Sequence, residues 1–204
     1  MSALARFFNA NGKKIAGYDK TPTPLTDELI SENIDIHFED NLNLVPENFK
    51  NLSDKINVLI IYTPAMPLDF SELNWFRENN YTVVKRSEVL GLITKQSFTI
   101  AVAGTHGKTT TSSIIAHLLK QGGVDCTAFL GGIAKNYNTN LVLGKPEKNS
   151  LPVVVVEADE FDRSFLTLYP DVAVVTSMDA DHLDIYHDKK NLEESYKSFI
   201  SQVK

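Results

Sequence analysis

Short apolar runs alternate with polar stretches along the whole chain. Apolar residues repeat at helical spacing over residues 1–8, and the polar, glycine-containing segment 9–12 then ends the predicted helix. The apolar runs that follow have the length of strands, and in the first half of the chain they are Ile15–Tyr18, Ile34–Phe38, Val58–Tyr62 and Tyr81–Val84. Since several of the stretches between them could be helical, the pattern predicts an α/β fold.

A second series of apolar runs follows, and these runs are almost uninterrupted by polar residues. They predict strands at Phe98–Ala103, Cys126–Leu130, Val153–Val156 and Val172–Thr176, with a helix over Lys108–Gln121. Continuous apolar strands are typical of a parallel sheet that is covered on both faces. Because the first of these strands leads into a new glycine-rich loop, we place a boundary within residues 92–97 and expect domains 1–94 and 95–204.

Composition and charge narrow the classes of function. Hydrophobic residues make up 43% of the 204 residues, the formal net charge is -6, and no block of lysine or arginine occurs. The chain therefore lacks the basic footprint needed to bind nucleic acid or an anionic membrane. Cys126 is the only cysteine, which excludes an internal disulfide and a cysteine-based zinc cluster. With no apolar run long enough to span a bilayer and no signal-like N-terminus, we expect a cytoplasmic protein.

The strongest chemical signal is a glycine-rich loop between a predicted strand and a predicted helix. A phosphate loop requires this context, because the glycines let several backbone N–H groups turn toward one phosphate at the positive end of the helix. Lys108 can reach terminal phosphates, and the Thr109 hydroxyl can bind Mg²⁺. The predicted nucleotide-binding residues are Gly104, Thr105, His106, Gly107, Lys108, Thr109 and Thr110. Val102 stands where the common motif has its first glycine, and this departure weakens an interpretation as a generic kinase or GTPase. The alternative to a phosphate loop is a glycine-rich turn with an incidental lysine.

Carboxylates follow the four valines of the strand at 153–156. Ligands bind at the carboxyl ends of strands in open α/β sheets, and a carboxylate placed there can hold the magnesium of a nucleotide. Glu157 is our candidate metal ligand, whereas Asp159 and Glu160 fit a solvated acidic loop equally well.

The strand at 172–176 also ends in a polar segment. His182 stands in this segment between Asp181 and Asp184. It is a candidate catalytic residue and metal ligand, although a lone histidine in a loop is more often a surface residue. Parallel strands would bring Lys108, Glu157 and His182 to one edge of the sheet.

These three segments, in this order, resemble the Mur ligase family, in which Gly-Thr-x-Gly-Lys-Thr, a strand ending in Glu and Asp-His-x-Asp form the ATP and metal site. The fuller strings, including His106, resemble the branch that adds L-alanine to UDP-N-acetylmuramate and the related branch that recycles muropeptides. Residues 1–5 resemble the segment after the glycine-rich turn of a Rossmann-like UDP-binding domain. The resemblance implies substrate contacts at Asp19, Thr63, Ala65, Gly131, Gly132 and Asn140. For Asp19, a loop-capping role is about as well supported.

The resemblance implies an ATP- and Mg²⁺-dependent ligase of peptidoglycan synthesis that joins L-alanine to UDP-N-acetylmuramate through an acyl phosphate. It allows a homo-oligomer and implies neither a nucleic-acid nor a membrane partner. Ser177 stands where the family usually has asparagine, so we assign it no role. The family's first strand, glycine-rich turn and C-terminal domain are missing, so we expect a truncated central ATP-binding domain and no amide formation by this chain alone. The alternatives are muropeptide recycling, a P-loop phosphotransferase or NTPase, and a nucleotide-binding fragment without catalysis.

Overall fold

The computed structural model describes residues 1–145, 150–179 and 189–204 and confirms an α/β protein. The chain forms two compact units, Met1–Arg86 and Ser87–Lys204. This division falls after the first residue of helix α5 (Arg86–Lys95), a few residues before the expected boundary between residues 94 and 95. The helix belongs with the second unit because its Gly91 lies against the backbone of Thr167 and its Thr94 hydroxyl accepts a hydrogen bond from the Tyr169 amide.

The first unit contains two separate parallel sheets of two strands each. β1 (Ala16–Tyr18) pairs with β2 (Asp35–His37), and β3 (Leu59–Tyr62) pairs with β4 (Thr82–Lys85). The helices between and around these strands are α1 (Ser2–Ala10), α2 (Pro24–Ser31), α3 (Glu47–Lys50) and α4 (Ser71–Glu78), with short 3-10 turns at Leu42–Leu44 and Lys55–Asn57. The predicted order of helix and strands is therefore confirmed, with boundaries shifted by one or two residues.

Local sequence explains how α2 begins and how it is held to α1. Thr23 and Thr26 form a reciprocal capping box, and Pro24 occupies the first helical turn, where its missing N–H costs no helical hydrogen bond. Arg6 of α1 binds Glu28 of α2 at 2.7 Å and Glu32 just beyond that helix at 2.8 Å. These contacts place α1 beside α2 within the first unit.

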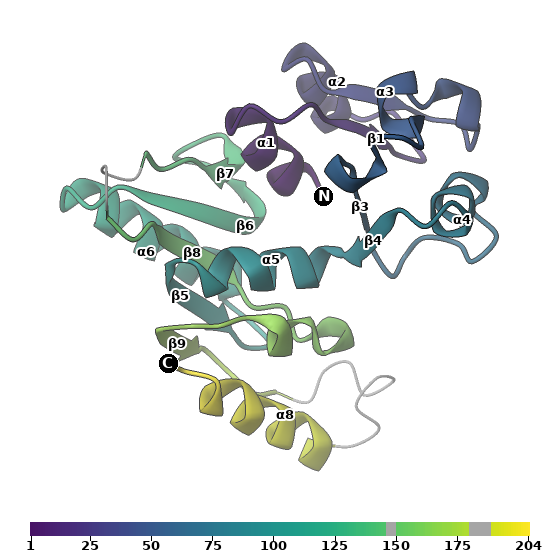
Figure 1. Ribbon diagram of the computed structural model, residues 1–204. Helices are drawn as coiled ribbons and strands as arrows, with labels where there is room; N and C mark the ends of the chain where they lie inside the picture. The colour runs from purple at the N-terminus through teal and green to yellow at the C-terminus, as the bar shows by residue number, and fades with distance from the viewer. Residues whose placement is uncertain (146–149, 180–188) are drawn as a thin grey trace. The chain divides into compact units, whose positions relative to one another are not determined.

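The second unit is built on one five-stranded sheet with the order β7-β6-β8-β5-β9. Its strands are β5 (Phe98–Ala103), β6 (Cys126–Ala134), β7 (Thr139–Val142), β8 (Val153–Glu157) and β9 (Val172–Val175). In Figure 1, α5 passes in front of this sheet and α6 (Lys108–Gln121) passes behind it, while η3 (Phe161–Thr167) packs with α8 (Lys189–Ser201). This arrangement has the doubly wound form expected for near-continuous apolar strands.

One strand departs from the purely parallel sheet that the sequence predicts. β7 runs antiparallel to β6, and the two form a hairpin whose turn contains Asn138 at φ 50. A short antiparallel partner at the sheet edge needs only a turn, not a crossover helix, and its mixed sequence gives no long apolar run to detect.

Helix α6 packs on the sheet with one face. Ser112, Ile115, Ala116 and Leu119 repeat at helical spacing on this face, and Ala116 packs with Cys126, Ala128 and Val155 in the core of the unit. Only the loop 104–107 separates the end of β5 from the N-terminus of this helix.

Candidate functional site

The loop 104–107 joins the end of β5 to the start of α6 and depends on its two glycines. Gly104 and Gly107 have φ values of 129 and 82, which L side chains rarely adopt. A Cβ atom on Gly104 would overlap the side-chain oxygen of Thr176 and lie 2.8 Å from the amide nitrogen of Ser177. The loop is therefore held against the end of β9, where a larger residue does not fit.

The end of β9 fixes this loop through hydrogen bonds. The amide of Thr105 donates to the carbonyl of Ser177 at 3.1 Å, and the amide of His106 donates to the Ser177 hydroxyl at 3.0 Å. The Thr176 hydroxyl donates to the carbonyl of His106 at 2.5 Å. Ser177, to which the sequence assigned no role, thus shapes the loop. Its position directly after a strand, beside the polar Thr176, was the signal available.

Lys108, the first residue of α6, turns back over the loop. Its ammonium donates to the carbonyl of Gly104 at 2.7 Å and lies 2.9 Å from both carboxylate oxygens of Glu160. Glu160 is 2% exposed, so the interpretation of this residue as part of a solvated acidic loop is wrong; the neighbouring Asp159 is exposed. The difference arises because residues 158–165 turn directly after β8, which places one carboxylate inside and the other outside.

Glu157 meets the loop from the neighbouring strand. It lies opposite Val102 in the pairing of β8 with β5. The Thr109 hydroxyl donates to Oε2 of Glu157 at 3.0 Å, and the Gly131 amide donates to Oε1 at 2.6 Å. Burial raises the pKa of Glu157 above its ordinary value, although these two hydrogen bonds oppose the rise.

The pair formed by Thr109 and Glu157 has the chemistry of a magnesium site. A hydroxyl and a carboxylate, both oxygen donors, lie within 3.0 Å of one another at the N-terminus of α6. A divalent cation placed between them would also relieve the desolvation of the Glu157 charge. Within residues 1–145, 150–179 and 189–204, no group of three or more His, Cys, Asp or Glu side chains is arranged for a metal.

Some predicted residues of this site make weaker contacts or are not described. Thr110 is exposed on the first turn of α6. The His106 ring is exposed and lies 3.9 Å from the carboxylate of Asp179, whose backbone carbonyl accepts from the Thr105 hydroxyl. His182, with Asp181 and Asp184, lies outside the described residues.

The predicted substrate residues Gly131, Gly132 and Asn140 lie in the two strands of the β6–β7 hairpin. The register of β6 against β7 shifts between Phe129 and Ala134, so Gly131 and Gly132 lie at an irregularity of the strand pairing. A Cβ atom on Gly131 would lie 2.5 Å from Oε2 of Glu157, so only glycine allows this carboxylate to approach the strand so closely. Of the three, Gly131 is thus directly part of the site.

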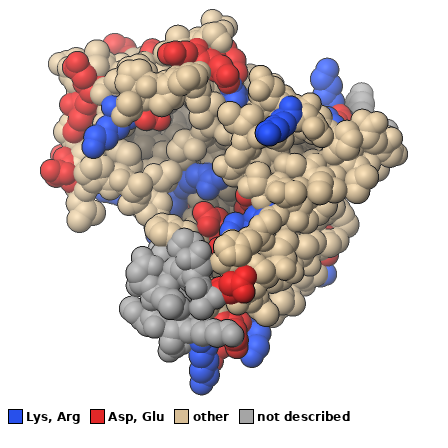
Figure 2. All heavy atoms as spheres, turned by 180° about the vertical axis from the view of Figure 1, so that it is seen from behind, with Lys and Arg blue, Asp and Glu red and all other residues tan. Residues whose placement is uncertain are grey.

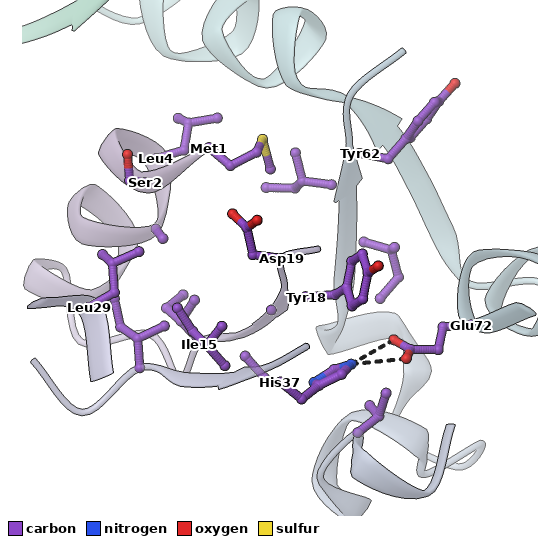
Figure 3. A pocket seen from close by; sticks show the side chains of 18 of the residues that line it. Met1, Ser2, Leu4, Ile15, Tyr18, Asp19, Leu29, His37, Tyr62 and Glu72 are labelled. Atoms are coloured by element: carbon purple, nitrogen blue, oxygen red, sulfur yellow. Dashed lines mark hydrogen bonds and ion pairs between the residues drawn. The ribbon is translucent and has the colours of Figure 1, made fainter. Parts of the chain in front are cut away.

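In the first unit, a pocket of about 370 Å³ lies between β1 and β3, with mainly apolar walls (Figure 3). Asp19, directly after β1, and Thr63, directly after β3, both line it, whereas the exposed Ala65 does not. The pocket thus brings together two of the three substrate residues that were predicted in this unit.

The same pocket contains a buried histidine–carboxylate contact that the sequence did not indicate. His37 Nε2 lies 2.9 and 3.1 Å from the two carboxylate oxygens of Glu72, and the amide of Asn41 donates to Glu72 at 2.9 Å. His37 is the last residue of β2 and Glu72 lies in the first turn of α4, 35 residues further along the chain. A pairing across such a distance leaves no local pattern in the chain.

Charged side chains of both signs are interspersed over the described atoms on the face shown in Figure 2, without a broad basic surface there. Among the described residues, no helix has the length and apolar character needed to cross a bilayer.

Sequence comparison places two family domains on the chain. The Mur ligase family catalytic domain matches residues 1–98, and the Mur ligase middle domain matches residues 102–204. A UDP-N-acetylmuramate--L-alanine ligase of Flavobacterium johnsoniae is 59% identical over 204 residues, and one of Porphyromonas gingivalis is 56% identical over 203 residues. This chain is matched over 100% of its length but spans only 43% of the length of those curated relatives.

Solved structures show the same arrangement. A UDP-N-acetylmuramate-alanine ligase from Thermotoga maritima superposes with a TM-score of 0.79 at 29% identity, covering 99% of this chain and 44% of that one. The UDP-N-acetylmuramate:L-alanyl-gamma-D-glutamyl-meso-diaminopimelate ligase from Neisseria meningitides gives a TM-score of 0.85 at 22% identity, covering 100% of this chain and 65% of that one. At this identity, the second comparison supports likeness of fold alone.

Proposed function

The chain belongs to the Mur ligase family, and on this premise we propose that it forms the UDP-sugar-binding and ATP-binding part of a ligase that joins L-alanine to UDP-N-acetylmuramate. The observation that carries the proposal is the convergence of Lys108, Thr109 and Glu157 at one edge of the sheet, with Thr109 and Glu157 in contact at 3.0 Å. Identity of 56–59% to the alanine-adding ligases favours L-alanine over a preformed peptide as the incoming amine.

The loop residues would hold the phosphates of ATP. The backbone amides of 104–109 lie at the positive end of α6, and the Lys108 ammonium lies beside them to offset the charge of the transferring phosphoryl group. Thr109 and Glu157 would hold Mg²⁺, which would supply positive charge to offset that of the phosphates. The site therefore combines the three elements that phosphoryl transfer requires: amide donors, a lysine and a metal position.

In the proposed reaction, an oxygen of the substrate's lactoyl carboxylate attacks the terminal phosphorus of ATP and ADP leaves. The acyl phosphate is then an electrophile, since phosphate is a far better leaving group than oxide. The amine of L-alanine attacks its carbonyl carbon, the C–O bond to phosphate breaks, and the amine loses a proton to give the amide. We assign His182, from the family motif, to a second metal or its water near the acyl phosphate.

The two units would each supply contacts to the sugar nucleotide. We assign Gly131, Gly132 and Asn140 to the muramoyl end. The reason is that the Gly131 amide and the Thr109 hydroxyl both donate hydrogen bonds to the carboxylate of Glu157. For the uridine end we retain Asp19, Thr63 and Ala65. Of these, Asp19 and Thr63 are supported by their place at the strand ends that line the pocket of the first unit.

Lys108→Ala tests this proposal. We expect its affinity for Mg·ATP, measured by titration calorimetry on the 204-residue chain, to fall by about ten- to a hundredfold, the equivalent of one lost hydrogen bond to a charged group. The same change in a complete ligase with this loop should lower amide formation by several hundredfold or more.

Lys197→Ala is the matched control, because Lys197 is an exposed lysine of α8. It should bind Mg·ATP as the unmodified chain does. Wild-type affinity in a folded Lys108→Ala protein would contradict the assignment of the loop, and melting curves should be recorded in parallel to establish folding.

A further inference from the structure

The Lys108 ammonium is held by two protein groups. It donates to the carbonyl of Gly104 at 2.7 Å and to Oε1 of Glu160 at 2.9 Å, and Oε2 of Glu160 also lies 2.9 Å away. The carboxylate therefore offsets the charge of the ammonium. A phosphate oxygen that arrives at Lys108 must compete with Glu160 for this charge.

Glu160 is held in place more firmly than its partner. Its side chain is 2% exposed, against 18% for Lys108. The backbone on either side is fixed, because the Ala158 amide donates to Val102 at 2.9 Å and the Arg163 amide donates to Glu160 at 3.0 Å. The carboxylate thus lies on a hydrogen-bonded segment between β8 and η3, and the longer, more exposed lysine side chain is the partner able to move.

We propose that Glu160 is a positioning residue that takes the place of a phosphate in the nucleotide-free site. It holds Lys108 folded over the loop, and it competes with the nucleotide for the lysine ammonium. This inference rests on the proposed nucleotide function of the loop.

The competition should depend on the charge of the ligand. Glu157 and Glu160 place two carboxylates beside the loop, and these repel a metal-free nucleotide. Mg²⁺ neutralises part of the phosphate charge and binds the oxygen pair of Thr109 and Glu157. Removing the charge of Glu160 should therefore help metal-free nucleotide more than metal-bound nucleotide.

The test is ADP binding to the 204-residue chain, with EDTA or with Mg²⁺, measured by titration calorimetry. We expect Glu160→Gln to bind metal-free ADP about tenfold more tightly, the effect of one ionic hydrogen bond that no longer competes. With Mg²⁺ the gain should be smaller. Asp159→Asn is the matched control, since it removes the same charge from the exposed neighbour and should change affinity less than about twofold.

A second comparison separates competition for Lys108 from general repulsion. In a Lys108→Ala background the gain from Glu160→Gln should largely disappear, because no ammonium remains to be released. A gain of equal size in that background would show repulsion alone and overturn the inference.

Other outcomes are equally decisive. If the unmodified chain binds ADP through Lys108 but Glu160→Gln binds equally or more weakly, the inference is wrong and the proposed function stands. If the folded unmodified chain and Glu160→Gln both fail to bind ADP with and without Mg²⁺, both proposals fail. Should circular dichroism show that Glu160→Gln is unfolded, Glu160→Asp replaces it. The shorter side chain withdraws the carboxylate from Lys108, and an unchanged metal-free affinity in that variant would overturn the inference.

Discussion

Glu157 shows how a single residue links the sheet, the loop and the metal position. Glu157 is the last residue of β8. Its carboxylate accepts one hydrogen bond from the Thr109 hydroxyl of α6 and one from the Gly131 amide of β6. Its carboxylate is desolvated, and this raises its pKa in the metal-free protein. Such a group is costly to keep charged until a cation arrives, so it stabilises the metal complex at some expense to the empty fold.

This cost predicts a pH dependence. The pKa of Glu157 is higher in the folded protein than its unfolded value of 4.5. Protonation of Glu157 therefore favours the folded state. This contribution to stability is fully present below pH 4.5 and is lost as the pH rises through the folded-state pKa. We expect Glu157→Gln to melt at a higher temperature than the unmodified chain at pH 7.5, and we expect the difference to shrink toward pH 4. Mg²⁺ with ADP should reverse the order at pH 7.5. Melting curves at both pH values, with and without Mg·ADP, test this; a constant difference between the two proteins would contradict it.

At the scale of elements, the two sheets of the first unit leave an unfilled space between them, whereas α5 and η3 in the second unit are in close contact. The walls of this pocket contain residues of β1 and β2 from one sheet and of β3 from the other. By contrast, Gly91 of α5 meets the backbone of Thr167 so closely that a Cβ atom would overlap the carbonyl oxygen.

One substitution made at two glycines tests this contrast. Gly17 of β1 lines the pocket, and a Cβ atom built on it finds no atom within 4 Å. Gly17→Ala should therefore stabilise the first unit by about 0.4–1 kcal/mol, chiefly by restricting the unfolded chain. Gly91→Ala should destabilise the second unit by about 1–3 kcal/mol, because α5 must shift away from Thr167. Denaturant titration measures both, and similar effects at the two positions would refute the contrast.

For the whole molecule, the two compact units predict two unfolding transitions. The phosphate loop, Lys108 and Glu157 all lie in Ser87–Lys204, so Mg·ADP should stabilise only that unit. At a ligand concentration a hundred times its dissociation constant, the expected gain is about 2.7 kcal/mol. Scanning calorimetry should show one transition moving with Mg·ADP while the other stays in place. A single transition that moves as a whole would show that the units unfold together.

The sequence by itself determined the order of elements and the chemistry of the main site. Apolar runs placed most of the strands, because burial between helices requires continuous hydrophobicity. The glycines, Lys108 and Thr109 identified the phosphate loop, because that chemistry needs particular residues close together in the chain. The family resemblance then supplied the reaction, which the residues alone left open.

Tertiary structure decided what depends on distant contacts. The acidic segment after β8 contains Asp159 and Glu160 side by side, and only the turn at the strand end buries one and exposes the other. The contacts of Ser177 with the loop and of His37 with Glu72 join residues 71 and 35 positions apart. β7 was missed because an edge strand paired on one side needs no long apolar run. These features arise from packing between segments, which local sequence patterns do not encode.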